Sequence, residues 1–243
     1  LGCYYITTIK PGVKGEGKIF SDPKEAIMAY ETGNVDIQAK VKVRINKKLI
    51  ETCVGRLYFN EIVPEEFGFI NEQADKKVLK NILSRSLEKF GEEKTVDLID
   101  SIKEMGFSFL TISGISWGMN DLIAPKEKWQ ILENATKKVE EIRQQYKSGL
   151  LTEDERYTKI IETWAKAKDQ VSEVSMKALD QYGSVYSMVS SGARGSWPQV
   201  VQMTGMRGLM ANPAGKTIEL PVKNSFKEGL DVLEYFISTH GAR

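Results

Sequence analysis

Two stretches of regularly spaced apolar residues, on either side of a glycine, constrain the fold of this chain most. In the first stretch, apolar or small residues recur in alternating steps of three and four, at Leu132, Ala135, Val139, Ile142 and Tyr146. In the second, beyond Gly149, the same rhythm continues at Tyr157, Ile160, Trp164, Ala167, Val171, Val174 and Ala178. This spacing puts one apolar stripe along each of two helices.

The segment between the two stripes is short enough to be a turn. Gly149 lies within it, and Thr152 with Glu155 matches the capping box that begins a helix. The sequence therefore predicts an antiparallel coiled-coil hairpin over residues 126–179. Its outer faces are rich in Lys, Glu, Arg and Gln. That leaves two interpretations open: a solvated hairpin stabilised only by its seam, or a protruding surface on which partners dock.

The N-terminal region has the composition of a strand-rich segment. Runs of β-branched and aromatic residues predict strands over Gly2–Thr8, Gly15–Phe20, Ala39–Ile50 and Thr52–Val63. Between the second and third of these, Ser21-Asp22-Pro23 predicts the start of a short helix that ends near Gly33. Together with the helical hairpin, these elements predict an α+β fold.

Further helices are expected on both sides of the hairpin. Apolar residues at helical spacing predict helices over residues 75–112. A glycine-containing loop follows, in which Trp117 is expected to be a packing anchor rather than a binding residue. Beyond the hairpin, the pattern predicts a short helix after Pro198, a glycine-punctuated loop, and a final helix capped by Asn224 or Ser225.

Composition narrows the classes of function. The 243-residue chain has a net charge of +1, so bulk electrostatics gives no case for binding nucleic acid or a membrane. No apolar run is long enough to span a bilayer. Cys3 and Cys53 are the only cysteines, and they are predicted to be buried and free in strand-like runs. Two cysteines without a paired histidine exclude a structural zinc site and fit a reducing, cytoplasmic compartment.

Two glycine-rich segments carry the best candidates for anion binding. They are Ser190–Ser196, which contains Arg194, and Gly205–Pro213, which contains Arg207. A guanidinium beside glycines suits phosphate, but such glycines equally serve tight turns and such arginines pair with nearby carboxylates. His240 is likewise either a structural or a catalytic group. No cluster of carboxylates is present that could hold the Mg²⁺ ions of a phosphoryl-transfer site.

Several motifs resemble one family. They are LGCYYIT at the N-terminus, SGARGS and GMRGLMANP in the two arginine segments, and EYFISTHGAR at the C-terminus. Further matches are KGEG, VGR, FNEIVP, SGIS, and SGLLT followed by ERY. In order, and over essentially the whole chain, these motifs resemble the largest-subunit (β′) family of bacterial DNA-directed RNA polymerases.

The resemblance implies a division of the chain. Residues 1–120 are similar to the pore region beside the active site, and residues 121–220 to the funnel region, whose hairpin forms the rim of the secondary channel. Residues 221–243 are similar to the start of the bridge helix. In the family, nucleotides enter through this channel and transcript-cleavage factors dock on its rim. Docking is therefore expected at Lys147, Ser148, Gly149, Leu150, Leu151, Thr152, Glu155 and Arg156.

The resemblance also assigns roles around the incoming nucleotide. Arg194 is expected to face the triphosphate, and Met188 to lie near the same nucleotide. A forked guanidinium suits phosphate oxygens because it makes paired, charge-assisted hydrogen bonds. Support of the active site is expected from Gln199, Gln202, Met206, Arg207, His240 and Arg243.

Other parts of the family's enzyme are expected outside the chain. The aspartate motif that holds Mg²⁺ is expected before Leu1 and the trigger loop after Arg243, so the isolated chain is expected to have no catalytic residue, metal ligand or activity of its own. Trp117, Asn120 and Lys227 depart from the residues usual in the family. The expected partners are the β, α, ω and σ subunits, the rest of β′, template DNA and RNA, in the cytoplasm at the bacterial nucleoid.

Two other functions are alternatives to the polymerase. The first is a free-standing coiled-coil module that captures cleavage factors or other rim-binding regulators. The second is a self-contained phosphate-binding enzyme that uses Arg194, Arg207 and His240. The reading frame around the chain separates the first alternative from the polymerase, and tight binding of nucleotide by the isolated chain is the mark of the second.

Overall fold

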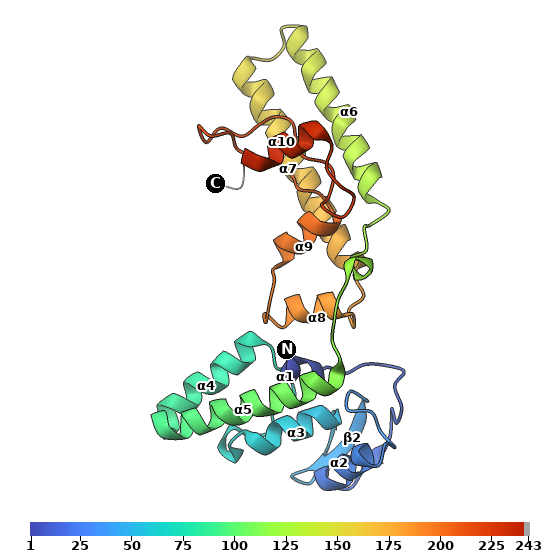
Figure 1. The fold of residues 1–243 in the computed structure, drawn as a ribbon, viewed down its shortest axis with the longest axis vertical. Coiled ribbons are helices and arrows are strands. Elements are labelled where there is room, and N and C mark those ends of the chain that lie inside the picture. Colours follow the sequence, from blue (N-terminus) through green and yellow to red (C-terminus); the bar gives the residue numbers. More distant parts are fainter. Residues whose placement is uncertain (241–243) are drawn as a thin grey trace. The chain divides into compact units, whose positions relative to one another are not determined.

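The computed structural model describes residues 1–240, which divide into two compact units. The first unit comprises Leu1–Ser116 with Tyr186–Arg194, and the second comprises Trp117–Val185 with the residues from Gly195 onward. Helices dominate both units, and a small sheet lies in the first (Figure 1). The predicted α+β class is confirmed.

The first unit holds helices α1 to α5 and strands β1 to β3. In chain order these are α1 (Gly2–Thr7), β1 (Ile19–Phe20), α2 (Pro23–Glu31), β2 (Val41–Ile45), β3 (Lys48–Thr52), α3 (Val54–Ile62), a 3-10 helix (Glu65–Phe67), α4 (Lys76–Phe90) and α5 (Glu92–Ser113). The helices predicted over residues 75–112 are confirmed. So is the helix after Ser21, because the Asp22 carboxylate accepts a 2.8 Å hydrogen bond from the Glu25 amide and caps α2.

The sheet is built on β2. Strand β1 pairs with β2 in parallel and β3 pairs with it antiparallel. The side chains of Val41 and Val43 are buried while those of Lys42 and Arg44 are exposed, as the alternation predicts. The prediction of one strand over Ala39–Ile50 is wrong. The chain reverses at Asn46 and Lys47, whose positive φ angles of 48° and 66° suit a tight hairpin turn.

Three other strand predictions are corrected by the structure. Gly2–Thr8 forms helix α1, and Thr52–Val63 forms the end of β3 followed by helix α3. Of Gly15–Phe20, only the last two residues are a strand. Frequent β-branched and aromatic residues suit any half-buried surface, so they do not fix an extended backbone by themselves.

Helices α1 and α3 pack closely against their neighbours through glycines. A Cβ atom on Gly2 would lie 2.0 Å from the Gly106 carbonyl oxygen of α5, and one on Gly55 would lie 1.9 Å from the Ile6 carbonyl oxygen of α1. The missing side chains therefore let these helices meet backbone to backbone. Large apolar residues such as Phe59 fill the space around that contact.

Both cysteines are buried and free, as predicted. Cys3 lies in α1 and Cys53 directly precedes α3, so their predicted placement in strands is wrong. Burial raises the pKa of each thiol, and Cys53 Sγ donates a 3.5 Å hydrogen bond to the Ile6 carbonyl oxygen. The two thiols are therefore held in their protonated, unreactive form near neutral pH.

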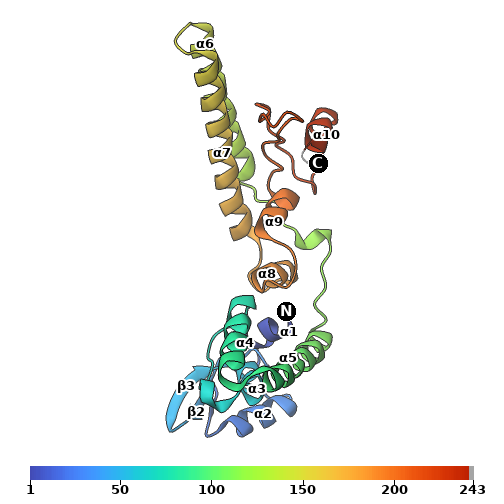
Figure 2. The same ribbon diagram turned by 90° about the vertical axis from the view of Figure 1, so that its left-hand side faces the viewer.

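The second unit is organised around a pair of long helices. Its elements are a 3-10 helix (Met119–Asp121), α6 (Lys128–Lys147), α7 (Glu153–Ala178), α9 (Trp197–Thr204) and α10 (Val232–Thr239), while α8 (Ser184–Ser190) crosses the division between the units. Helices α6 and α7 lie side by side along their length (Figure 2). Their predicted apolar stripes form one buried cluster of Leu132, Ala135, Val139, Ile160, Trp164, Ala167 and Val171.

The final helix begins later than predicted. Neither Asn224 nor Ser225 caps α10, which begins at Val232 after the N-cap residue Asp231. The Ser225 hydroxyl instead donates a 2.7 Å hydrogen bond to the Glu228 carboxylate and closes a turn ahead of the helix. A cap and such a turn give the same sequence signal, because in both a hydroxyl pairs with a carboxylate three residues on.

Some large apolar side chains of the second unit are exposed. Trp117 keeps 52% of its surface in solvent, so its prediction as a packing anchor is wrong. Trp129 of α6 and Phe236 of α10 are also exposed. Within residues 1–240, no helix combines the length and the apolar character needed to cross a membrane.

Candidate functional site

The tip of the α6–α7 hairpin is a short, well-ordered turn. Gly149 occupies it with a φ of +76°, a backbone conformation that side chains disfavour. Its amide donates a 2.9 Å hydrogen bond to the Tyr146 carbonyl, and the Leu150 amide donates a 3.0 Å bond to the Gln145 carbonyl. These bonds satisfy carbonyls at the end of α6 and reverse the chain tightly.

The capping box predicted at the start of α7 is present. The Thr152 hydroxyl accepts a 3.3 Å hydrogen bond from the Glu155 amide, and the Glu155 carboxylate accepts a 2.9 Å bond from the Thr152 amide. Hydrogen bonds from the Thr152 amide and hydroxyl lower the pKa of Glu155. The first turn of α7 therefore keeps its negative charge at neutral pH.

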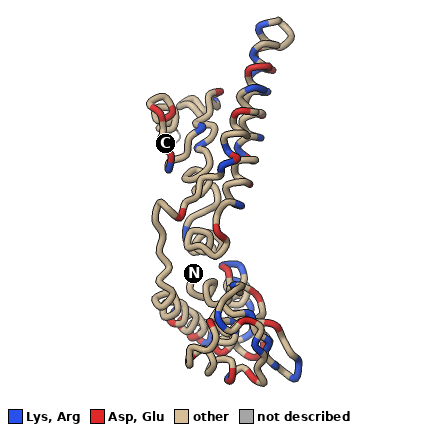
Figure 3. Tube along the Cα trace, turned by 90° about the vertical axis from the view of Figure 1, so that its right-hand side faces the viewer, with Lys and Arg blue, Asp and Glu red and all other residues tan. Residues whose placement is uncertain are grey.

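Most of the residues expected to dock partners are exposed at this tip. Leu150 keeps 73% of its surface in solvent, an unusually high fraction for a leucine. Lys147, Ser148, Gly149, Thr152 and Glu155 are exposed around it, and Leu151 is half-buried. Positively charged lysines and arginines and negatively charged aspartates and glutamates run along the hairpin below the tip (Figure 3).

Arg156, the last of the expected docking residues, faces inward. Its Nη1 and Nη2 atoms donate hydrogen bonds of 2.7 Å and 2.9 Å to the two carboxylate oxygens of Glu219. The side chain of Arg156 is only 16% exposed, and its guanidinium lies over the Tyr146 ring, 5.2 Å from the ring centroid. Both terminal nitrogens of Arg156 thus bond inside the second unit, while its buried Nε atom has no hydrogen-bond partner there.

The glycine-punctuated loop predicted after α9 forms a narrow antiparallel ribbon. Backbone bridges pair Gly208 with Val222 and Ala211 with Thr217. The Tyr157 hydroxyl of α7 donates a 2.9 Å hydrogen bond to the Thr217 carbonyl, beside the Arg156 contact. We call residues 208–222 the loop ribbon; its outer end is held against the first turns of α7.

Arg207 lies at the base of the loop ribbon and is committed to local contacts. Its Nε donates a 3.2 Å hydrogen bond to the Ser238 hydroxyl of α10, and its Nη1 donates to the Gln202 side-chain oxygen of α9. The guanidinium also lies 5.2 Å from the centroid of the Phe226 ring. These contacts connect α9, the loop ribbon and α10, and their partners are an amide oxygen, a hydroxyl and an aromatic ring rather than the nearby carboxylates that the sequence offered as an alternative.

The other expected support residues differ in exposure. Met206 is fully buried in the seam of the hairpin, whereas Gln199 is exposed on α9. His240 is exposed at the C-terminal end of α10. Arg243 lies outside the described residues. The structure thus brings Gln202 and Arg207 into direct contact.

Arg194 and Met188 meet in the first unit, at the turn that follows α8. The Arg194 amide donates a 3.4 Å hydrogen bond to the Met188 carbonyl, and the Arg194 side chain is exposed. Gly192 and Gly195 flank the arginine with φ angles of +71° and +82°. The two glycines set the path of the turn and leave the guanidinium reachable from solvent.

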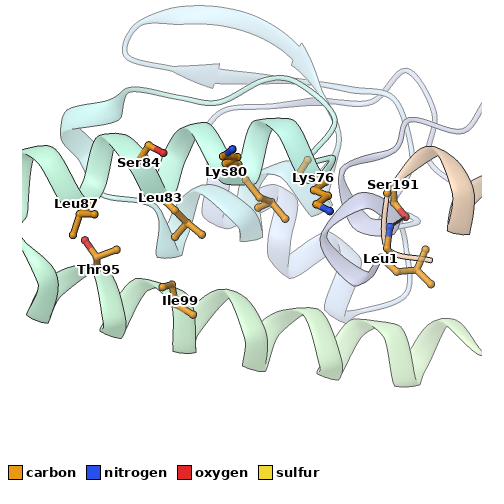
Figure 4. A pocket seen from close by; sticks show the side chains of 13 residues that line it. Leu1, Lys76, Lys80, Leu83, Ser84, Leu87, Thr95, Ile99 and Ser191 are labelled. Atoms are coloured by element: carbon orange, nitrogen blue, oxygen red, sulfur yellow. Dashed lines mark hydrogen bonds between the residues drawn. The ribbon is translucent and has the colours of Figure 1, made fainter. Parts of the chain in front are cut away.

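A groove that the sequence analysis missed adjoins this turn. Its volume is about 560 Å³, and most of the residues that line it belong to α4 and α5 (Figure 4). The Lys76 amide donates a 3.1 Å hydrogen bond to the Ser191 carbonyl and so fixes the turn at one end of the groove. In the sequence, Leu87 and Ile99 belong to the apolar residues at helical spacing, but in the structure both are exposed.

The described residues contain no set of side chains suited to bind a metal ion. Within residues 1–240, no group of three or more His, Cys, Asp or Glu side chains converges closely enough to hold an ion. Two carboxylates of the second unit, Glu219 and Glu228, instead pair with Arg156 and Lys128.

Comparison with known protein families identifies the family of this chain. The family model described as RNA polymerase Rpb1, domain 3, matches residues 1–122, which is half of the chain. That of RNA polymerase Rpb1, domain 4, matches residues 151–231. The chain belongs to the RNA polymerase Rpb1 family. The resemblance drawn from its motifs is therefore confirmed.

Three curated relatives of this Rpb1-family chain are named as the subunit beta′ of DNA-directed RNA polymerase. Across its full length it is 50% identical to the DNA-directed RNA polymerase subunit beta′ of Pelotomaculum thermopropionicum and 49% identical to that of Desulforudis audaxviator. The subunit beta′ of Clostridium botulinum strain Okra is 46% identical, again over the whole chain. The chain spans about a fifth of the length of these relatives: 21%, 21% and 22%.

Proposed function

We propose that this chain is a section of the β′ subunit of a DNA-dependent RNA polymerase and lines the channel through which nucleotides reach the active site. Within it, the α6–α7 hairpin forms the rim of that channel, and its tip is a docking surface for regulators such as transcript-cleavage factors. The observation that carries the proposal is the exposed Leu150 at the end of a rigid apolar seam, in a chain similar to β′ subunits along its whole length.

The tip combines two features that favour the binding of a protein partner. An exposed leucine flanked by Lys147 and Glu155 offers both apolar area and charges of opposite sign. Buried interface cores gain from apolar contacts, while surrounding charges set orientation and association rate. The seam beneath the tip keeps these side chains in one arrangement, which reduces the entropy lost on binding.

Arg194 is proposed to contact the triphosphate of the incoming nucleotide, with Met188 beside the same nucleotide. The exposed guanidinium of Arg194 and the glycines that flank it support this role, since phosphate needs both charge and close approach of the backbone. Gln199, Gln202, Met206, Arg207, His240 and Arg243 are proposed to support the site. Arg207 does so indirectly, through the contacts described above.

The remaining parts of the reaction are proposed to come from outside these residues. Nucleotidyl transfer in the complete polymerase requires Mg²⁺, template DNA and RNA, and the β, α, ω and σ subunits as partners. Residues 1–120 are proposed to belong to the pore region, 121–220 to the funnel region and 221–243 to the start of the bridge helix. By itself the chain is proposed to bind and position, not to catalyse.

The proposal is tested in a complete polymerase that carries substitutions at the tip. Lys147→Ser combined with Leu150→Ser removes the charge and the apolar area that a partner needs. We expect the stimulation of transcript cleavage by an added cleavage factor to fall about tenfold, the equivalent of about 1.4 kcal/mol of binding. Each value is compared with the factor-free rate of the same enzyme.

A matched control lies lower on α6. Glu133 and Lys137 form a solvent-exposed ion pair of 2.8 Å that contacts neither the tip nor the loop ribbon. Glu133→Ser combined with Lys137→Ser changes the same number of residues on the same helix and is expected to leave the stimulation unchanged. Full stimulation of the tip variant at limiting factor concentration would show that the tip is not the docking surface.

A further inference from the structure

One ion pair holds the loop ribbon to the hairpin near its tip. Arg156 lies in the first turns of α7, and both of its terminal nitrogens bond to Glu219 of the loop ribbon, at 2.7 Å and 2.9 Å. The two residues are 63 positions apart in the chain, so the pair joins distant segments. A bidentate arginine–carboxylate pair fixes orientation as well as distance, because both partners are planar.

Neighbouring contacts make the pair more than a surface ion pair. Arg156 is 16% exposed and Glu219 29% exposed, so water screens them less than it screens most surface charges. Tyr146 of α6 covers the guanidinium from one side, at 5.2 Å. The hydrogen bond of the Glu219 side chain also raises the pKa of Arg156. The contact is therefore held in one geometry by α6, α7 and the loop ribbon.

Arg156 is also tied directly to the hairpin tip. Its amide donates a 3.0 Å hydrogen bond to the Thr152 carbonyl, the first backbone bond of α7. Thr152 in turn shares the capping box with Glu155. A partner that contacts Thr152 or Glu155 therefore contacts the same helical turn from which the Arg156 side chain extends.

The opposite end of the loop ribbon is bonded to α10. Glu234 of α10 accepts hydrogen bonds from the Lys223 amide at 2.8 Å and from the Asn224 amide at 3.2 Å. At the base of the ribbon, the Arg207 amide donates a 3.1 Å bond to the Asn224 carbonyl. A continuous set of bonds therefore leads from the hairpin tip, through Arg156 and Glu219, to the start of α10.

We propose that the Arg156–Glu219 pair is a positioning link, through which a partner docked at the hairpin tip changes the placement of the loop ribbon and α10. The inference rests on the proposed function, since it requires a docking partner at the tip and a polymerase in which α10 adjoins the nucleotide. A partner acts through the link only by favouring one arrangement of the first turn of α7 over another. Arg156 and Glu219 are positioning residues and touch no substrate.

The test uses a complete polymerase, a purified transcript-cleavage factor, and the substitutions Glu219→Gln and Arg156→Lys. Glutamine keeps the size of Glu219 but removes its charge, and lysine keeps the charge of Arg156 but removes the fork. Two quantities are measured for each enzyme: the affinity of the factor, and the change that saturating factor produces in the KM and kcat of nucleotide addition.

If the pair acts as such a link, a substitution in it should reduce the effect of the factor on nucleotide addition without reducing the affinity of the factor. In the Glu219→Gln enzyme the factor binds with an affinity within about twofold of the wild type, but its effect on KM falls at least about fivefold, the lower end of typical coupling between sites. Exchanging the two charges, with Arg156→Glu and Glu219→Arg together, restores part of the effect. A purely structural role would instead weaken factor binding and factor-free nucleotide addition together.

The outcomes distinguish this inference from the proposed function. If the factor does not bind the wild-type polymerase, or binds the tip variant as tightly as the wild type, both the proposed function and this inference are wrong. Normal binding with a full effect of the factor in the Glu219→Gln enzyme overturns the link alone. The Glu133→Gln enzyme is the matched control, because that glutamate also pairs with a cation, Lys137, but on an exposed face of α6.

Discussion

Lys128 has no exposed side-chain surface, and its ammonium donates directly to the Glu228 carboxylate. Burial lowers the pKa of Lys128, because water no longer stabilises its charge. Burial alone raises the pKa of Glu228, but hydrogen bonds from Lys128 and Ser225 outweigh it and bring that pKa below its usual value. The pair thus joins the base of α6 to the turn ahead of α10.

Removing one partner of this pair is expected to destabilise the second unit strongly. Glu228→Ala leaves the Lys128 ammonium buried without a counter-charge, which costs about 3 kcal/mol or more. Urea unfolding of the chain measures this loss. Glu133→Ala, which breaks a fully solvated pair on the same helix, is expected to cost about 0.5 kcal/mol or less. Equal losses in the two variants would contradict the burial argument.

The same pair is expected to make stability sensitive to acid. Because the pKa of Glu228 is lower in the folded chain than its ordinary value of 4.5, its contribution is complete above that value and is lost as the pH falls through the folded pKa. The stability difference between the wild type and Glu228→Gln should therefore shrink as the pH is lowered below about 4.5. A difference that stays constant down to acid unfolding would exclude this linkage.

Glycine at position 55 is expected to be essential for the packing of α3 on α1. In Gly55→Ala the new Cβ lies 1.9 Å from the Ile6 carbonyl oxygen, so the helices must separate, at a cost of about 3 kcal/mol. Gly118→Ala is the matched control, since its Cβ meets open space. Thermal unfolding of the two variants gives the comparison, and a melting temperature for Gly55→Ala as high as that of the control would refute the prediction.

Substitution of Arg194 tests its proposed contact with the triphosphate. In a complete polymerase, Arg194→Ala is expected to lower kcat/KM for nucleotide addition about tenfold to a hundredfold, and Arg194→Lys to recover only part of it, because lysine lacks the fork. Single-nucleotide addition at varied nucleotide concentration gives both constants. Wild-type values for Arg194→Ala would assign the glycines and the arginine to the turn alone.

How far the sequence predicted the structure depended on the range of each interaction. The hairpin was predicted well because Leu132 to Ala178 repeat one local signal many times over, and the capping box at Thr152 marks its second helix. By contrast, α1 and α3 were mistaken for strands. Both helices pack through Gly2 and Gly55 against backbone far away in the chain, and no local pattern encodes such contacts.

The candidate site shows the same difference between local interactions, which could be predicted, and long-range ones, which could not. Exposure of the hairpin tip followed from a turn at Gly149 that leaves no room for a core. The inward orientation of Arg156 could not be predicted, since its partner Glu219 lies 63 residues further on. Similarly, Ser225 pairs with Glu228 in a turn, although the two residues read equally well as the start of a helix.

The burial of both cysteines leaves the surface of this chain without a native reactive thiol. A single cysteine introduced in place of Ser148, at the hairpin tip, would be the one thiol of the chain that reacts readily with a maleimide dye, because Cys3 and Cys53 are shielded and protonated. A fluorophore placed there would report directly on the arrival and departure of molecules at the end of the hairpin.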